Sequence, residues 1–222
     1  MTAALNIIQR EHRALAAVLH CFDQVLNEVV AQRLEPDFAL FEAIIEYVQN
    51  FPDRFHHPKE DELLFPAVRR RAPEASAALD TLAHQHEEGV RHTNELKWRL
   101  AAWKNGEAGA IAAFDTAAKA FIDFQRRHMG LEEREIIPAA RRALTDADWA
   151  AIDAAFGAND DPMFGGRPKA AFDALFSQIA RLAPEPHGFG PRKEPAPQID
   201  AARLAALRDP HARSRLVDLH WI

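Results

Sequence analysis

The sequence predicts an all-α protein: an antiparallel up-down four-helix bundle built from two repeated helical hairpins, with a mixed short-helix and Pro-rich C-terminal extension. Apolar residues recur at three- and four-residue steps along four long segments, and prolines or turn residues separate these segments. Parts of the first half of the chain also repeat in the second half. Because short turns join the four segments, neighbouring helices should be antiparallel.

The first predicted hairpin contains two helices. One covers residues 5–30, and His12 falls on its apolar stripe. The other covers residues 38–68, with Pro52 and Pro58 as kinks or breaks, because proline cannot donate a helical hydrogen bond.

The second predicted hairpin covers residues 74–103 and 108–144. An Asn-Gly pair at 105–106 separates its helices, and both residue types tolerate the left-handed conformation that closes a helix. Gly130 and Pro138 should interrupt the last helix.

The sequence pattern weakens after the fourth helix. Thr145 and Asp148 resemble a capping box for a short helix, and residues 172–182 could form another. Pro184–Pro197 has the composition of an extended linker. We therefore expect a bundle domain, a short helical extension and a Pro-rich linker and tail, at residues 1–145, 146–183 and 184–222.

Composition excludes several classes of protein. The 222 residues include 27 Lys+Arg and 33 Asp+Glu, a formal net charge of -6, and the basic residues are scattered, so no nucleic-acid partner is expected. No apolar run is long enough to span a bilayer, and the first residues lack the pattern of a secretion signal. We expect a cytoplasmic protein without a membrane partner.

Cysteine and histidine usage restricts the chemistry further. Cys21 is the only cysteine, which excludes an internal disulfide, a Cys-ligated zinc site and an iron–sulfur cluster. The sequence contains 11 histidines, more than is typical for this length. Any metal must therefore be held by His and carboxylate side chains.

An internal repeat carries several of these histidines. Residues 56–70 match residues 128–142 at an offset of 72, with six identical positions. An offset of 74 aligns residues 5–12 with residues 79–86. Each half is therefore a helix with a matching His, His12 or His86, followed by a helix with His-x-x-x-Glu, as expected for two duplicated hairpins.

The His-x-x-x-Glu spacing places both side chains on one helix face. Four residues advance a helix by about 400° and roughly 6 Å, so both side chains can reach one metal centre. A lone buried His is more often a hydrogen-bonded core residue, but matched His and Glu on inward faces are costly to bury without partners. The predicted ligands are His12, His56, Glu60, His86, His128 and Glu132.

Two such halves packed around a pseudo-twofold axis would make a dinuclear site. Imidazoles and bridging carboxylates suit iron or manganese, and helix bundles commonly build such sites from facing helices. The expected ligand count leaves coordination positions open to water, dioxygen, peroxide or nitric oxide.

These motifs resemble a known family. His12, the segment from Phe55 to Pro66, His86-Glu-Glu-Gly89 and His128-x-x-x-Glu132 are similar to the bacterial hemerythrin-like proteins with the HHE cation-binding domain, over residues 5–145. The resemblance implies a hemerythrin-like four-helix bundle that holds two Fe ions in an oxo- or hydroxo-bridged, non-haem diiron centre. Mn or Zn is less expected.

The resemblance also implies a function. We expect a protein that binds or reduces a small oxygen or nitrogen species, namely O2, peroxide or NO, at open coordination sites. The alternative is a metal-dependent iron or redox sensor, or a partner-docking module, without turnover. The expected partner is a small diatomic or peroxide ligand, and a homodimer is a candidate assembly.

Two departures leave ligand positions open. Oxygen-carrying hemerythrins have a fifth His at the position that Val90 occupies, and their last carboxylate is an Asp at the five-step position, here Glu133. The repeat favours Glu132 instead. His57 and Asp61 form a four-step pair that competes with His56 and Glu60.

Overall fold

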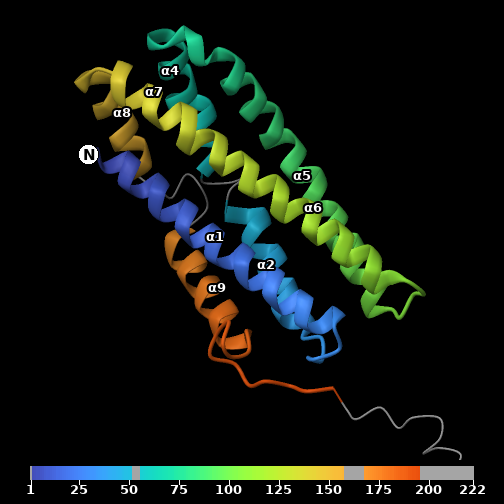
Figure 1. The fold of residues 1–222 in the computed structure, drawn as a ribbon. Coiled ribbons are helices and arrows are strands. Elements are labelled where there is room, and N and C mark those ends of the chain that lie inside the picture. The colour runs from blue at the N-terminus through green and yellow to red at the C-terminus, as the bar shows by residue number, and fades with distance from the viewer. Residues whose placement is uncertain (1, 52–55, 158–167, 196–222) are drawn as a thin grey trace, which may run out of the picture.

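The computed structural model describes residues 2–51, 56–157 and 168–195, and over these ranges the chain forms helices and no β-strand. The predicted all-α class is therefore confirmed for the part described. In Figure 1 the long helices α1, α5 and α6 run alongside one another, and the contacts pair α1 with α6, α5 with α6 and α2 with α5. Within the described residues, two of the four long predicted helices are each divided into shorter segments.

The first two helices begin where the sequence predicts. α1 spans Ala3–Val30, and the Thr2 side chain accepts a hydrogen bond from the backbone N–H of Leu5 at its start. α2 spans Phe38–Phe51, and the Asp37 carboxylate accepts from the first backbone N–H groups of this helix. Asp37 therefore caps the N-terminus of α2.

The rest of the second predicted helix is divided into α3 (His57–Lys59), the π-helical turn η2 (Glu60–Leu64) and α4 (Phe65–Arg71). Pro58 lies within the first turn of α3, where its missing N–H breaks no hydrogen bond. The predicted kink at Pro52 lies outside the described residues.

The fourth predicted helix is divided in the same way. It comprises α6 (Ala110–Leu131), the π-helical turn η4 (Glu132–Ile136) and α7 (Ile137–Ala143). Gly130 does not interrupt α6, contrary to the prediction; it leaves room for the Arg134 guanidinium, which a Cβ would meet at 2.7 Å.

Each π-helical turn has a proline just after it, at matching positions of the repeat. Pro66 and Pro138 have no N–H, and their rings would clash with the carbonyl four residues back in a regular helix. The chain instead forms wider turns in which Phe65 donates to the Glu60 carbonyl and Ile137 to the Glu132 carbonyl. The interruption predicted at Pro138 is therefore confirmed, and Pro66 causes its counterpart.

The third helix, α5, spans Ser76–Lys104 and follows the short 3-10 helix η3 at Pro73–Ala75. Asn105 is its C-terminal cap, and Gly106 has a φ of +73°, in the left-handed region. The predicted Asn-Gly boundary is confirmed.

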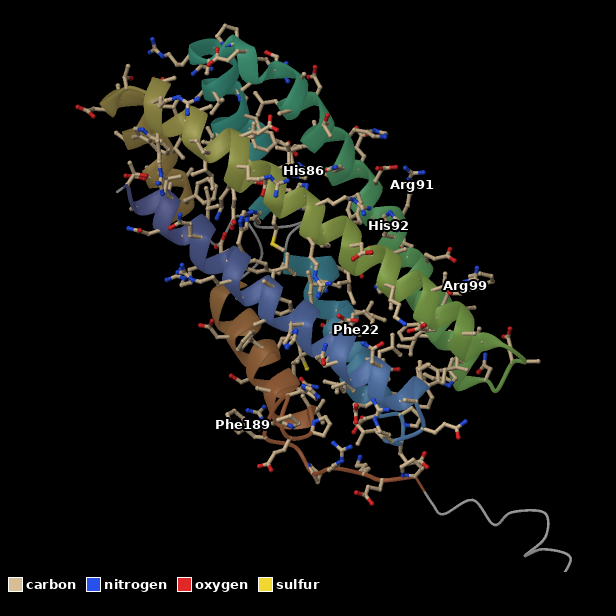
Figure 2. All side chains as sticks on the ribbon, viewed as in Figure 1. Phe22, His86, Arg91, His92, Arg99 and Phe189 are labelled. Carbon is tan, nitrogen blue, oxygen red and sulfur yellow. The ribbon has the colours of Figure 1, made fainter. Side chains whose placement is uncertain are left out.

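Two apolar clusters form the core, with a polar layer between them. The larger cluster contains Phe22, labelled in Figure 2, together with Phe41 and Phe114. The smaller cluster contains Trp149 and Phe156. The buried polar layer consists of Glu11, His12, His56, His57, Glu60, His86, Thr93, Gln125, His128 and Glu132.

Two further helices, α8 and α9, pack against the helices described above. α8 spans Asp146–Gly157, and the predicted capping box is confirmed, because Thr145 and Asp148 exchange side-chain-to-backbone hydrogen bonds of 3.0 and 3.3 Å. α9 spans Pro168–Leu182, starting before the predicted residue 172. α8 contacts α1, and α9 contacts α2 (Figure 1).

The segment after α9 differs from the predicted extended linker. Residues 184–190 fold back as a turn, in which Phe189 N–H donates to the Ala180 carbonyl and Gly190 N–H to the Ala183 carbonyl. Gly190 permits this close approach, because a Cβ would lie 2.5 Å from the Leu182 carbonyl oxygen. Residues 191–195 form neither helix nor strand, and the remainder of the predicted linker and tail, residues 196–222, lies outside the described residues. Among the described residues, no helix has the length and apolar character needed to cross a bilayer.

Candidate metal centre

The structure brings the predicted ligands together in the buried polar layer and adds His57 to them. They form two groups, which we call the His12 group and the His57 group. Within each group the candidate ligand atoms lie within 4.8 Å of one another. The His12 group contains His12, His56, Glu60 and Glu132, and the His57 group contains His57, His86 and His128.

These side chains come from four parts of the fold. His12 lies on α1 and His86 on α5, whereas His128 is in the last turn of α6. Glu60 and Glu132 are the first residues of the two π-helical turns. In Figure 2 the side chains of Arg91 and Arg99 extend outward from α5, whereas His86 points inward and is 7% exposed.

Glu60 reaches both groups with different oxygens. Its Oε1 lies 3.3 Å from His56 Nε2, and its Oε2 lies 3.7 Å from His86 Nε2. A carboxylate in this position can bridge two metal ions.

Glu132 does the same from the opposite half. Its Oε2 lies 3.1 Å from His12 Nε2, whereas its Oε1 lies 3.3 Å from His128 Nε2 and 4.0 Å from His86 Nε2. The two carboxylates thus each present one oxygen to the His12 group and the other to the His57 group.

Several buried ligand atoms have no hydrogen-bond partner within the described residues. They are Glu60 Oε2, His86 Nε2, His128 Nε2 and both Glu132 carboxylate oxygens. An unpaired buried polar atom costs about 1–3 kcal/mol. Four of these atoms face the His57 group and Glu132 Oε2 faces the His12 group, so the five atoms fit cations bound at both groups, which would accept their lone pairs.

Hydrogen bonds on the outer side of each ring orient the first two histidines. His12 Nδ1 lies 3.1 Å from Glu133 Oε1, and His56 Nδ1 lies 2.8 Å from Glu11 Oε2. A carboxylate only accepts, so each Nδ1 carries a proton. The two Nε2 atoms lie 3.1 Å apart and form a hydrogen bond. Burial acts to lower the pKa of both rings, but Glu132 raises the pKa of His12, and Glu60 and Glu11 raise that of His56, so a bound metal would replace a proton at this contact.

The other hydrogen-bonded pairs follow the same plan. His86 Nδ1 lies 3.0 Å from both Asp61 carboxylate oxygens, and His128 Nδ1 lies 3.1 Å from Gln85 Oε1. Outer partners of this kind hold the ring orientation of metal-binding histidines.

The electrostatics of two histidines favour the ligand form. Burial lowers the pKa of His128 to about 4, and burial together with the neighbouring His86 lowers the pKa of His57 well below its ordinary value. Both imidazoles are therefore neutral near pH 7, as a metal ligand requires.

The Glu60 and Glu132 carboxylates do not both ionise easily, because they are buried close together. Burial raises the pKa of Glu60, and the adjacent Glu132 carboxylate raises it further. Burial also acts to raise the pKa of Glu132, but His128 and His12 hold it well below its ordinary value. Two carboxylates buried this close need added positive charge to ionise together, which metal ions supply.

The geometry favours one of the alternatives that the sequence leaves open at each position. Glu132 points inward, whereas the Glu133 side chain is 54% exposed and supports His12 from outside. Asp61 likewise supports His86 and is not a candidate ligand. Val90 is 42% exposed, so it does not mark an inward ligand position.

His57 is the residue that sequence reasoning treated only as a competitor of His56. Adjacent residues in a regular helix point about 100° apart, which favoured a choice between them. His56 lies just before α3 with helical backbone angles, and both rings are buried in the polar layer. The adjacent His-His pair just before a proline was the available signal.

The family comparison agrees with this geometry. A family model described as the hemerythrin HHE cation binding domain matches residues 3–140, a range that contains all the candidate ligands. Neither a curated protein nor a solved structure gives a match. The match and the inward His and Glu clusters together imply metal binding, with iron as the metal that this domain implies. The chain therefore belongs to the hemerythrin HHE cation-binding family.

Proposed function

We propose that this chain is a non-haem diiron protein that binds or reduces a small oxygen or nitrogen species, namely O2, peroxide or NO. In this proposal the helices act as a hemerythrin-like four-helix bundle, with α2–α4 and α6–α7 as its two interrupted members. The observation that carries it is the pair of shared carboxylates, since Glu60 and Glu132 each direct one oxygen to each histidine group.

The histidines divide unequally between the two metal positions. One position takes His12 and His56, and the other takes His57, His86 and His128. With both carboxylates shared, an octahedral ion keeps more open coordination positions at the first than at the second. An external ligand is therefore expected at the position of His12 and His56.

The donor set supports iron. Imidazole and carboxylate donors suit iron or manganese, and Cys21, the only thiol of the chain, is not in either group. Bound iron supplies the redox chemistry that these side chains lack.

The protein contributes orientation and exclusion of water. The outer hydrogen bonds hold the ring orientations of four histidines, and apolar clusters cover the polar layer on both sides. All seven candidate side chains are buried, so only a small molecule is expected to reach them.

Reconstitution tests the proposal. The purified protein, loaded with ferrous iron without oxygen and then exposed to air, should bind two irons per chain and gain a visible absorption that changes with azide, peroxide or nitric oxide. Glu135→Gln, at an exposed position of η4, serves as a control that keeps both metals. Protein that stays colourless and metal-free would overturn the proposal.

A second candidate function, a metal-dependent sensor without turnover, is favoured by one specific contact path. Four aromatic rings form this path. The ring centroids of Phe176 on α9 and Tyr47 lie 6.2 Å apart, those of Tyr47 and Phe51 lie 5.6 Å apart in a stacked arrangement, and those of Phe51 and His56 lie 6.5 Å apart, also stacked. Metal binding at His56 could thereby change the packing of α9. Hydrogen exchange of α9 should then slow on iron binding, and unchanged exchange would exclude this function.

A further inference from the structure

The internal repeat extends beyond the candidate ligands to their outer hydrogen-bond partners. Asp61 and Glu133 each follow a shared carboxylate, at the same offset of 72. Each supports a histidine of the other half: Asp61 contacts His86, and Glu133 contacts His12.

A second pair of partners follows the other offset. Glu11 and Gln85 each directly precede the candidate ligand of the first helix of their half, His12 or His86, at an offset of 74. Glu11 lies 2.8 Å from His56 Nδ1, and Gln85 lies 3.1 Å from His128 Nδ1. The geometry is therefore duplicated, but the chemistry is not, since one acceptor is a carboxylate and the other a neutral amide.

We propose that Glu11 and Gln85 are positioning residues that make the two metal positions electronically unequal, so that the position of His12 and His56 holds the more oxidised iron. This inference rests on the diiron function proposed above. A carboxylate that accepts from Nδ1–H increases the electron density of the imidazole and its strength as a donor, which an amide does less. Stronger donors stabilise the ferric state and lower the reduction potential.

Burial makes Glu11 the most effective of these partners. Its side chain is 10% exposed, against 41% for Asp61 and 54% for Glu133, and its contact with His56 is the shortest of the four. Charges in a buried setting are screened much less than exposed charges. Both histidines of the first position have carboxylate partners, whereas His128 has an amide.

The test is a reciprocal exchange of the two residues. Glu11→Gln, Gln85→Glu and the double exchange nearly preserve side-chain size, so circular dichroism should report an unchanged helix content. The iron-loaded proteins are compared by their reduction potentials, by Mössbauer spectra of the one-electron-reduced form and by their iron affinity. Glu87→Gln, at an exposed position of α5, is the matched surface control.

The expected shifts have opposite signs. Glu11→Gln should raise the reduction potential and weaken iron binding about 10-fold or more. Gln85→Glu should lower the potential. In the double exchange the ferric iron of the one-electron-reduced form should move to the position with three histidines.

The outcomes separate this inference from the diiron function. Variants that bind two irons and share the potential and Mössbauer spectrum of the parent would overturn the inference and leave the diiron function standing. A parent protein that fails to bind two irons would overturn both. Gln85→Glu provides a test in the opposite direction if Glu11→Gln does not fold.

Discussion

The two halves of the repeat share a scaffold and differ at the metal centre. Each half supplies one His from its first helix, then His-x-x-x-Glu and a π-helical turn that starts at the Glu. Duplication therefore accounts for four histidines and two shared carboxylates. The departures from duplication concern how many donors each proposed metal position would receive and how strong those donors would be.

The clearest departure is at His57, whose counterpart in the second half is Met129. His57 stacks on His86 with ring centroids 3.9 Å apart, within the polar layer. Met129 is 8% exposed and belongs to the larger apolar cluster. The same position thus supplies a candidate ligand in one half and packing in the other, which makes the proposed metal centre asymmetric within a repeated scaffold.

The largest expected effect on iron content comes from removing a carboxylate that both halves supply, Glu60 or Glu132. Glu132→Ala should reduce iron content from two per chain to nearly none, because this carboxylate lies within 4.0 Å of an Nε2 atom in both groups. Glu60→Ala should do the same for the same reason. Metal analysis by mass spectrometry measures the loss, and one retained iron in both variants would show that the carboxylates do not bridge.

The next largest effect on iron binding should come from His57, which has no histidine counterpart in the second half. His57→Met gives the first half the residue of the second half, and it should weaken binding of one iron about 10-fold or more while the other stays bound. Titration with ferrous iron resolves the two steps. Val90→Ala is the control, because Val90 is exposed, and equal loss in the two variants would mean that His57 is not a ligand.

Metal removal should lower the thermal stability of both halves together by a moderate amount. At a free iron concentration 100 times the Kd, each iron that binds the native state adds about 2.7 kcal/mol to the free energy of unfolding. For a chain of this size that corresponds to a rise in Tm of roughly 5–10 °C. Calorimetry with and without a chelator measures the shift, and an unchanged Tm would contradict binding to a preformed site.

The smallest effect on the metal centre is expected at Cys21, which differs between the halves and belongs to neither group of candidate ligands. Cys21 is buried on α1, and its counterpart at the offset of 74, Glu95, is exposed. Burial raises the pKa of the Cys21 thiol to about 11, from an ordinary value near 9. Its thiolate fraction at pH 8 should therefore fall about 100-fold, and thiol reagents should label the folded protein far more slowly than the unfolded one. Equal labelling rates would show that Cys21 is accessible.

Local patterns in the sequence predicted much of the fold. Apolar periodicity depends on residues three and four apart, so it located α1, α5 and the start of α2 without tertiary information. The capping box at Thr145 and the Asn-Gly pair at 105–106 are local signals as well, and both are confirmed. The repeat then identified six residues that the structure brings together.

Features that depend on non-local packing were not predictable in the same way. The inward position of both His56 and His57 depends on how the chain enters α3. The turn at 184–190 forms because glycines permit close contact with the end of α9, whereas its proline content alone indicates an extended chain. Composition reports local preference and cannot report such contacts.

Metal content per chain, measured by mass spectrometry together with the visible spectrum before and after anaerobic reduction and re-exposure to air, tests the central claim most directly. The diiron account predicts two irons per chain and visible bands that bleach on reduction and return in air. One zinc per chain, or no metal at all, would contradict it.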